Sequence, residues 1–304
     1  MVYPKIFKSL ALSVPVMKDI VSERDELRNE LGRVMHDAKK LQEQNVDLKL
    51  RLEINSAEIK EKQGDIKISD SGITANQNAG YCHCCRSESI FQINNEWLRD
   101  HYVCLKCFSI PRQRHLQYVL DNYWKGWEQK VIHESSPSNV LISQYCNAYS
   151  KSQFFDGVPG GEIYQDVRCE NLESMTFPDS SFDIFITQDV FEHIFNPNLA
   201  AKEIARVLKP GGIHIFSAPK YEGLDKSFRR AQMSGAEIDY LHEAEYHGNP
   251  VGDGKSLVTF HYGDDFENLI FRWSGMNTTT YVTRCRDVGI DGKFIEVFVS
   301  KKTD

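Results

Sequence analysis

The stretch that decides the fold is FDIFITQDVFEHIFNPNLAAKEIARVLKPGGIHIFSAP, residues 182–219. Its apolar run Phe182–Thr187 is typical of a short buried strand. Residues 197–208 carry an apolar face at helical spacing, and Lys-Pro-Gly-Gly at 209–212 is a strong helix stop. A second apolar run, 213–217, predicts the next strand. Strand, helix and strand in this order indicate an α/β domain with a mostly parallel sheet.

Polar side chains follow the first of these strands. Gln188 and Asp189 come directly after it, and the pair Glu192-His193 lies three residues further on. In open α/β sheets, ligands bind at the carboxyl ends of the strands. We therefore expect the binding site at this edge, with Gln188 among the residues that contact a cofactor.

The same stretch resembles the class I S-adenosylmethionine-dependent methyltransferases of the methyltransferase-11 group. In that group an FD strand, an EH pair and an EIxRVLKPGG-like helix recur in this order, after a segment similar to NLESMTFPDSSFD at 171–183. The resemblance covers roughly residues 80–304 and extends to one bacterial branch with an N-terminal cysteine module. It implies a Rossmann-like sheet, S-adenosylmethionine as cofactor, and methyl transfer.

The resemblance places the methionine part of the cofactor on HESSPS, residues 133–138. Glu134 would accept from the α-amino group, and Ser135 and Ser136 would donate to the carboxylate. The wider superfamily has a glycine-rich turn here, so serine at these positions is a departure from the pattern. An alternative is that the serines only cap a predicted helix, 139–145.

Two further positions depart from the family pattern. The strand expected at 149–154 usually ends in an acid that binds the ribose hydroxyls, and the nearest residue here is Gln153, with Asp156 as a second candidate. The acid that contacts the adenine amine is replaced by Asn171, whose carbonyl can still accept a hydrogen bond.

Methyl transfer to oxygen or nitrogen can need a base in addition to positioning. The sequence offers three candidates as catalytic residues: Asp189, His193 and His247. His247 belongs to a polar and aromatic insertion at about 220–265, which we expect to cover the pocket. A packing role for His193 remains an equal alternative.

A cysteine module is expected at about 80–112. Two CxxC pairs separated by eighteen residues form it, and their spacing is that of a closed four-thiolate site. The expected ligands are Cys82, Cys85, Cys104 and Cys107. The metal would be structural zinc, with iron as the alternative, and His83 or Cys84 could substitute for one ligand.

The N-terminal region, residues 1–59, shows apolar residues at heptad spacing from Met17 to Leu52. This pattern predicts a coiled coil, and Asn45 at a core position favours a parallel dimer. A single amphipathic helix packed on its own domain is the alternative. Residues 60–79 are polar and indicate a linker, and the methyltransferase domain is expected from 113 to 304 with its last two strands as an antiparallel edge.

Composition excludes some classes of partner. The chain has 36 basic and 43 acidic residues, a net charge of −7, so no nucleic acid is expected. No apolar run approaches the ~18 residues of a membrane span, and the first residues lack a signal-peptide pattern, which together favour the cytoplasm. We expect a small-molecule or carbohydrate-type acceptor. The alternatives are a catalytically inactive binding or scaffold protein and a zinc-ribbon methyltransferase of RNA or protein.

Overall fold

The computed structural model describes residues 74–137, 141–235, 237–248 and 254–303, all within one compact unit, Ile68–Asp304. The expected coiled coil in 1–59 and the linker up to residue 73 lie outside these ranges. Within them, no helix is both long enough and apolar enough to cross a membrane.

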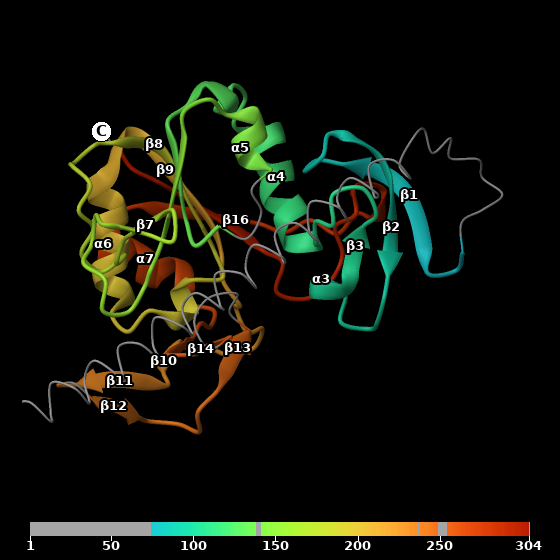
Figure 1. The fold of residues 1–304 in the computed structure, drawn as a ribbon. Coiled ribbons are helices and arrows are strands. Elements are labelled where there is room, and N and C mark those ends of the chain that lie inside the picture. Colours follow the sequence, from blue (N-terminus) through green and yellow to red (C-terminus); the bar gives the residue numbers. More distant parts are fainter. Residues whose placement is uncertain (1–73, 138–140, 236, 249–253, 304) are drawn as a thin grey trace, which may run out of the picture. The chain divides into compact units, whose positions relative to one another are not determined.

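An eight-stranded mixed sheet forms the centre of the unit, in the order β16-β17-β9-β8-β4-β5-β7-β6 (Figure 1). Five neighbouring strands run parallel: β7 (Val167–Cys169), β5 (Tyr149–Gln153), β4 (Ile132–Ser135), β8 (Phe182–Gln188) and β9 (Leu208–Ser217). The short β6 (Ile163–Tyr164) pairs antiparallel with β7 at one edge. The predicted α/β class and mostly parallel sheet are confirmed.

Alternation along β8 gives the sheet its two apolar faces. Ile184 and Ile186 point into a core with helices α4 (Pro111–Tyr123) and α5 (Ile142–Tyr145). Phe185, one residue out of phase, belongs to the opposite core, which contains residues of α6 (Pro197–Val207) and α7 (Phe266–Ser274). Burial on both faces explains why the strand reads as an almost continuous apolar run.

The last two strands form the expected antiparallel pair at one edge of the sheet. β17 (Val297–Lys301) inserts between β9 and β16 (Asn277–Tyr281) and is antiparallel to both. β16 therefore runs in the same direction as β9 and forms the edge. Val297, Phe298 and Val299 are buried on both faces, which only an interior strand permits.

The cysteine module is a three-stranded antiparallel sheet of β1 (Gln77–Cys82), β2 (Ser87–Ile93) and β3 (Tyr102–Cys104), with the short helix α3 (Leu98–His101) between β2 and β3. β1 begins at Gln77, inside the range assigned to the linker. The boundary expected at 112/113 falls inside α4, which packs on the central sheet.

Arg114 of α4 joins the module to a distant part of the chain. Its guanidinium is completely buried and donates to the carbonyls of Tyr102, Ser109 and Gly289. Gly289 follows the 3₁₀ turn η3 (Arg286–Val288) in the connection between β16 and β17. Because each donor of this buried cation finds a carbonyl, the module and this connection are fixed to each other.

The insertion folds into small antiparallel pairs (Figure 1). β10 (Phe228–Arg229) pairs with β15 (Phe260–His261), β11 (Ala231–Ser234) with β12 (Glu237–Tyr240), and β13 (Tyr246–Gly248) with β14 (Lys255–Leu257). Its Thr259 amide donates to the carbonyl of Glu192 at 2.7 Å, which attaches the insertion to the chain just after β8.

Candidate functional site

The carboxylate of Glu134 lies at the carboxyl end of β4 and is completely buried. One oxygen accepts from the Tyr149 hydroxyl at 2.7 Å, and the other accepts from the Gln188 amide at 3.1 Å. A buried carboxylate needs such partners to remain in place. The parallel register of β4 with β5 and β8 therefore brings two of the expected cofactor residues, Glu134 and Gln188, together.

The other end of the Gln188 amide is unsatisfied. Its Oε1 is buried and has no hydrogen-bond partner among the described residues. A carbonyl oxygen of this kind is an acceptor, so it fits an amino or hydroxyl donor from a ligand at the ends of β4 and β8.

The turn after β4 keeps a conformation usually taken by glycine. Ser136 has φ of 53°, in the left-handed region, and its amide donates to the carbonyl of Ser152 at 2.8 Å. Ser135, just before it, is buried. Serine therefore stands here in a backbone conformation that glycine adopts readily. Helix α5 begins at Ile142, later than expected, and has no side-chain cap bond.

Gln153 and Asn171 lie at neighbouring strand ends. Gln153 is the last residue of β5, one position after the Ser152 that pairs with Ser135 in the parallel register, and it is half-buried. Asn171 is exposed, and its Oδ1 accepts from the Glu173 amide at 2.9 Å. The Asn171 side-chain carbonyl, which was expected to contact adenine, thus already accepts one local hydrogen bond and has one lone pair left.

Asp189 is held by two arginines. One carboxylate oxygen accepts from Arg99 of α3 at 2.6 Å and also from Arg112 of α4, and the other accepts from the Ser217 hydroxyl at 3.0 Å. Burial raises the pKa of Asp189, but the two guanidinium groups outweigh it, and the net pKa is lowered. A carboxylate in this environment is a weak proton acceptor, so the arrangement supports an anchoring role for Asp189 instead of the expected catalytic one.

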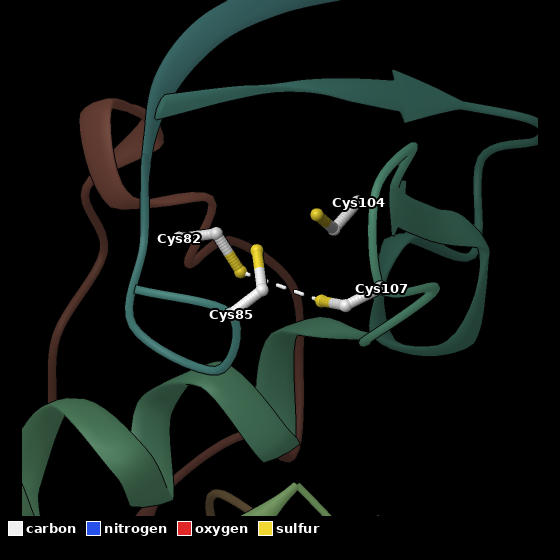
Figure 2. A group of neighbouring side chains, drawn as sticks. All are labelled: Cys82, Cys85, Cys104 and Cys107. Carbon is white, nitrogen blue, oxygen red and sulfur yellow. Dashed lines mark hydrogen bonds between the residues drawn. The ribbon is translucent and has the colours of Figure 1, made fainter. Parts of the chain in front are cut away.

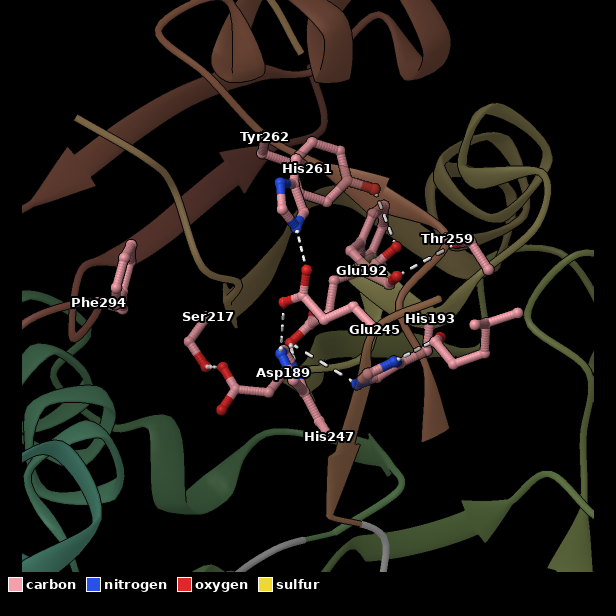
Figure 3. Close-up of polar contacts among 12 residues, drawn as sticks. Asp189, Glu192, His193, Ser217, Glu245, His247, Thr259, His261, Tyr262 and Phe294 are labelled. Atoms are coloured by element: carbon pink, nitrogen blue, oxygen red, sulfur yellow. Dashed lines mark hydrogen bonds and ion pairs between the residues drawn. The ribbon is translucent and has the colours of Figure 1, made fainter. Parts of the chain in front are cut away.

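The structure brings the other two catalytic candidates together around Glu192 (Figure 3). One Glu192 oxygen lies 3.8 Å from Nε2 of His193 and 3.8 Å from Nδ1 of His247. Glu192 and His193 belong to the 3₁₀ turn η2 (Phe191–His193), and His247 comes from β13 of the insertion. The insertion thus contributes a side chain to the site, as the sequence suggested.

Burial controls the charge of this group. It raises the pKa of Glu192 to about 8, with a further contribution from the negative charge of Asp189. Burial also lowers the pKa of His193 to about 4 and lowers that of His247. Both imidazoles are therefore neutral near pH 7 and offer lone pairs.

The cysteine cluster has the geometry of a four-thiolate metal centre (Figure 2). The four sulfurs lie within 4.8 Å of one another, and those of Cys82 and Cys107 are 3.7 Å apart. Sulfurs bound tetrahedrally at ~2.3 Å are separated by roughly 3.8 Å, so the cluster fits a zinc or iron ion. His83 is paired with Asp121 at 2.7 Å, which leaves it turned to α4 and not to the cluster.

Sequence reasoning did not identify Arg99 and Arg112 as site residues. Both lie in segments that carry the family resemblance, WLRDHYVCLKC and SIPRQR, but nothing local connects them with Asp189, ninety and seventy-seven residues away. A signal was nevertheless present, since a buried acid at a strand end requires a cation.

Comparison with known proteins supports the same interpretation. Residues 139–216 match the family model described as "Methyltransferase domain". A "Probable S-adenosylmethionine-dependent methyltransferase" from Mycolicibacterium smegmatis is 37% identical over 147 residues, which are 46% of this chain and 55% of that protein. The matched region thus spans about half the length of this relative.

Solved structures with detectable similarity include two bacterial methyltransferases. The 1,6-didemethyltoxoflavin-N1-methyltransferase of Burkholderia thailandensis has a TM-score of 0.40 and 12% identity, covering 64% of this chain and 79% of that one. A structure described as a "putative S-adenosylmethionine dependent methyltransferase" from Listeria monocytogenes has a TM-score of 0.40 and 8% identity, covering 64% of this chain and 99% of that one. Residues 139–216 therefore match a methyltransferase domain, and the wider region is similar to an S-adenosylmethionine-dependent methyltransferase.

Proposed function

We propose that the chain is an S-adenosylmethionine-dependent methyltransferase that acts on a small-molecule or carbohydrate-type acceptor. The observation that carries the proposal is the group at the ends of β4 and β8. There Glu134, the left-handed Ser136 and the unsatisfied carbonyl of Gln188 converge, and β4 lies between two strands of the family-matched segment 139–216, β5 and β8.

The residues present fit the methionine part of this cofactor. The buried Gln188 carbonyl and the Glu134 carboxylate are acceptors for its α-amino group, and the Ser135 and Ser136 hydroxyls are donors for its carboxylate. We assign Gln153, at the end of β5, to the ribose hydroxyls and Asn171 to the adenine amine. An amide binds a diol less strongly than a carboxylate does, so we expect moderate affinity for the cofactor.

The cofactor supplies an electrophilic methyl group on a sulfonium. An acceptor lone pair forms the new bond in line as the carbon–sulfur bond breaks, its electron pair stays on sulfur, and the acceptor gives up a proton. The chain must orient the acceptor and receive or relay this proton. Neutral His193 and His247 lie beside the strand end and suit that task, whereas Asp189 is engaged by Arg99 and Arg112.

Two further assignments belong to this proposal. The four-cysteine centre holds structural zinc, since its closed thiolate set has the spacing of that ion and leaves no position for substrate. We also propose that the N-terminal heptads, which lie outside the described residues, form a parallel coiled-coil dimer. Light scattering on the full chain gives the mass of the assembly and tests this. A four-thiolate metal centre and four further cysteine thiols support a reducing compartment, the cytoplasm.

Calorimetric titration of the zinc-replete full chain with S-adenosylmethionine and S-adenosylhomocysteine tests the proposal. We expect micromolar binding, weakened at least tenfold in Glu134→Gln, which keeps the shape of the side chain but removes its charge. Glu88→Gln, on an exposed part of β2, is the matched control and should bind like the parent. A folded protein that binds neither ligand would contradict the enzyme assignment and favour the scaffold role.

A further inference from the structure

Glu192 is a buried carboxylate without a partner. The residue is only 1% exposed, and neither of its carboxylate oxygens has a hydrogen bond within the part of the chain that the structure describes. Such a group is unfavourable unless something outside the protein satisfies it. One of these oxygens, Oε1, lies 3.8 Å from Nε2 of His193 and 3.8 Å from Nδ1 of His247.

Backbone contacts fix which nitrogen of His193 faces the carboxylate as an acceptor. Its Nδ1 lies 2.9 Å from the carbonyl of Leu257, which can only accept, so Nδ1 carries the hydrogen. In the neutral ring, Nε2 is then a lone pair directed toward the Glu192 oxygen. Two acceptors facing each other repel unless a proton or a metal cation lies between them, and the facing lone pairs from two histidines favour the metal cation.

Glu245 orients the second histidine in the same way. Nε2 of His247 lies 3.5 Å from one Glu245 oxygen, which leaves Nδ1 as the lone pair on the side of Glu192. The other Glu245 oxygen accepts from His261 at 2.9 Å and faces Arg230 at 3.3 Å, so the carboxylate is itself held in place. An imidazole supported by a carboxylate on its far nitrogen is the usual arrangement for a metal-binding histidine.

We propose that Glu192, His193 and His247 form a second metal site, for a divalent first-row transition ion of the zinc type. The three ligand atoms lie within 4.8 Å of one another (Figure 3). Ligands about 2.0–2.1 Å from a tetrahedral ion are separated by roughly 3.4 Å, so a small contraction completes the set. Two imidazoles and one carboxylate suit such ions, whereas Mg²⁺ and Ca²⁺ prefer oxygen alone.

Three protein ligands leave coordination positions for a substrate atom, in contrast to the closed cysteine centre. An acceptor hydroxyl bound there would lose its proton more easily, and the proton would pass to solvent, because the lone pairs of His193 and His247 would then be on the ion and the histidines would act through it instead of as bases. The acceptor oxygen would form the bond to the methyl carbon as the carbon–sulfur bond breaks and its electron pair stays on sulfur. This role rests on the proposed function, but occupancy of the site does not. The favoured acceptor class is therefore a hydroxyl compound able to reach the ion.

Zinc stoichiometry of the full chain tests the site. The parent and three variants, Glu192→Gln, His247→Gln and His242→Gln, are dialysed against chelator-buffered zinc, and bound zinc per chain is measured by elemental mass spectrometry. His242 is an exposed histidine of the same insertion and serves as the matched control. Glu192→Gln keeps the side-chain volume and removes a buried charge, so its folding, checked by circular dichroism, should be preserved.

The expected result is two zinc ions in the parent and in His242→Gln, and one in the other two variants. Cobalt replacement should give thiolate charge-transfer bands in all four proteins, with additional weaker bands lost in Glu192→Gln and His247→Gln. One ion in the parent with thiolate bands, or a second ion that persists in both variants, would overturn the site. Cofactor titration of the same samples separates this failure from that of the proposed function, because neither measurement depends on the other.

Discussion

Ser136 shows how a glycine-free turn can keep a cofactor loop in shape. Its backbone is left-handed, a conformation that costs a non-glycine residue about 1–2 kcal/mol. Ser136→Gly removes this cost but adds chain entropy in the unfolded state, so we expect its free energy of unfolding within about 1 kcal/mol of the parent. Ser136→Val, β-branched, should lower it by about 2 kcal/mol in urea unfolding. Equal stability of the two variants would contradict the left-handed turn.

Asp189 provides a second prediction at the scale of one residue. Asp189→Asn leaves Arg99 and Arg112 with only the more exposed Asp100 as counter-charge, so the free energy of unfolding at pH 7 should fall by about 2 kcal/mol. Because the folded pKa is lowered, this contribution is complete above the unfolded pKa of about 3.9 and disappears as the pH falls through the folded value. The difference between parent and variant, measured by urea unfolding, should therefore be constant from pH 7 to pH 5 and shrink below about pH 4. A difference that grows in acid would be inconsistent with the ion pairs.

At the scale of the element, Gly80 allows β1 to approach the connection between β16 and β17. A Cβ there would lie 2.1 Å from the Asp287 carbonyl oxygen, which is backbone and cannot rotate away. Gly80→Ala should lower the free energy of unfolding by about 2–3 kcal/mol, as overpacking does. Gly248→Ala meets no atom within 4 Å and is the matched control. Chemical denaturation at saturating zinc gives both values, and equal stabilities would rule out this contact.

The elements differ in how far sequence predicted them, and the reason is physical. β8 and α6 match their predicted ranges within one residue, because strand and helix each carry a strong local period and a clear stop. The insertion was predicted only as a polar cover, since strands of two to four residues have too few positions for alternation to show. The position of β17 between β9 and β16 could not be predicted, because strand order depends on contacts between residues far apart in sequence.

The site follows the same division. Glu134, Gln188, His193 and His247 were predictable because they follow strand ends or stand in an aromatic insertion, where parallel topology brings ligands together. The roles of Asp189 and Glu192 were not predictable from sequence, because they depend on which side chains face each carboxylate. Two arginines from the cysteine module face Asp189, whereas no hydrogen-bond donor among the described residues faces Glu192.

At the scale of the whole molecule, we expect the cysteine module to depend on the proposed metal, and the catalytic edge to depend in part on the module. The module's own buried apolar cluster is only Cys82, Cys84, Phe91, Tyr102 and Cys104, and two of these are metal-ligand candidates. Such a small core cannot offset the chain entropy of three strands, so the metal must supply folding free energy. The central sheet, with two large cores, has no such requirement.

Removal of the metal under reducing conditions should therefore unfold one part of the molecule and spare another. We expect amide hydrogen exchange to become faster in β1–β3 and in residues 285–290, which Arg114 joins to the module, by at least tenfold. Exchange in β8 and β9 should stay slow, because their burial does not involve the cysteines. Mass spectrometry of peptides before and after chelation measures both, and zinc added back should restore the protection. Unchanged exchange in β1–β3 after complete metal loss would mean that the module is stable by packing alone, with Arg99 and Arg112 holding it against Asp189 instead of the metal holding it together.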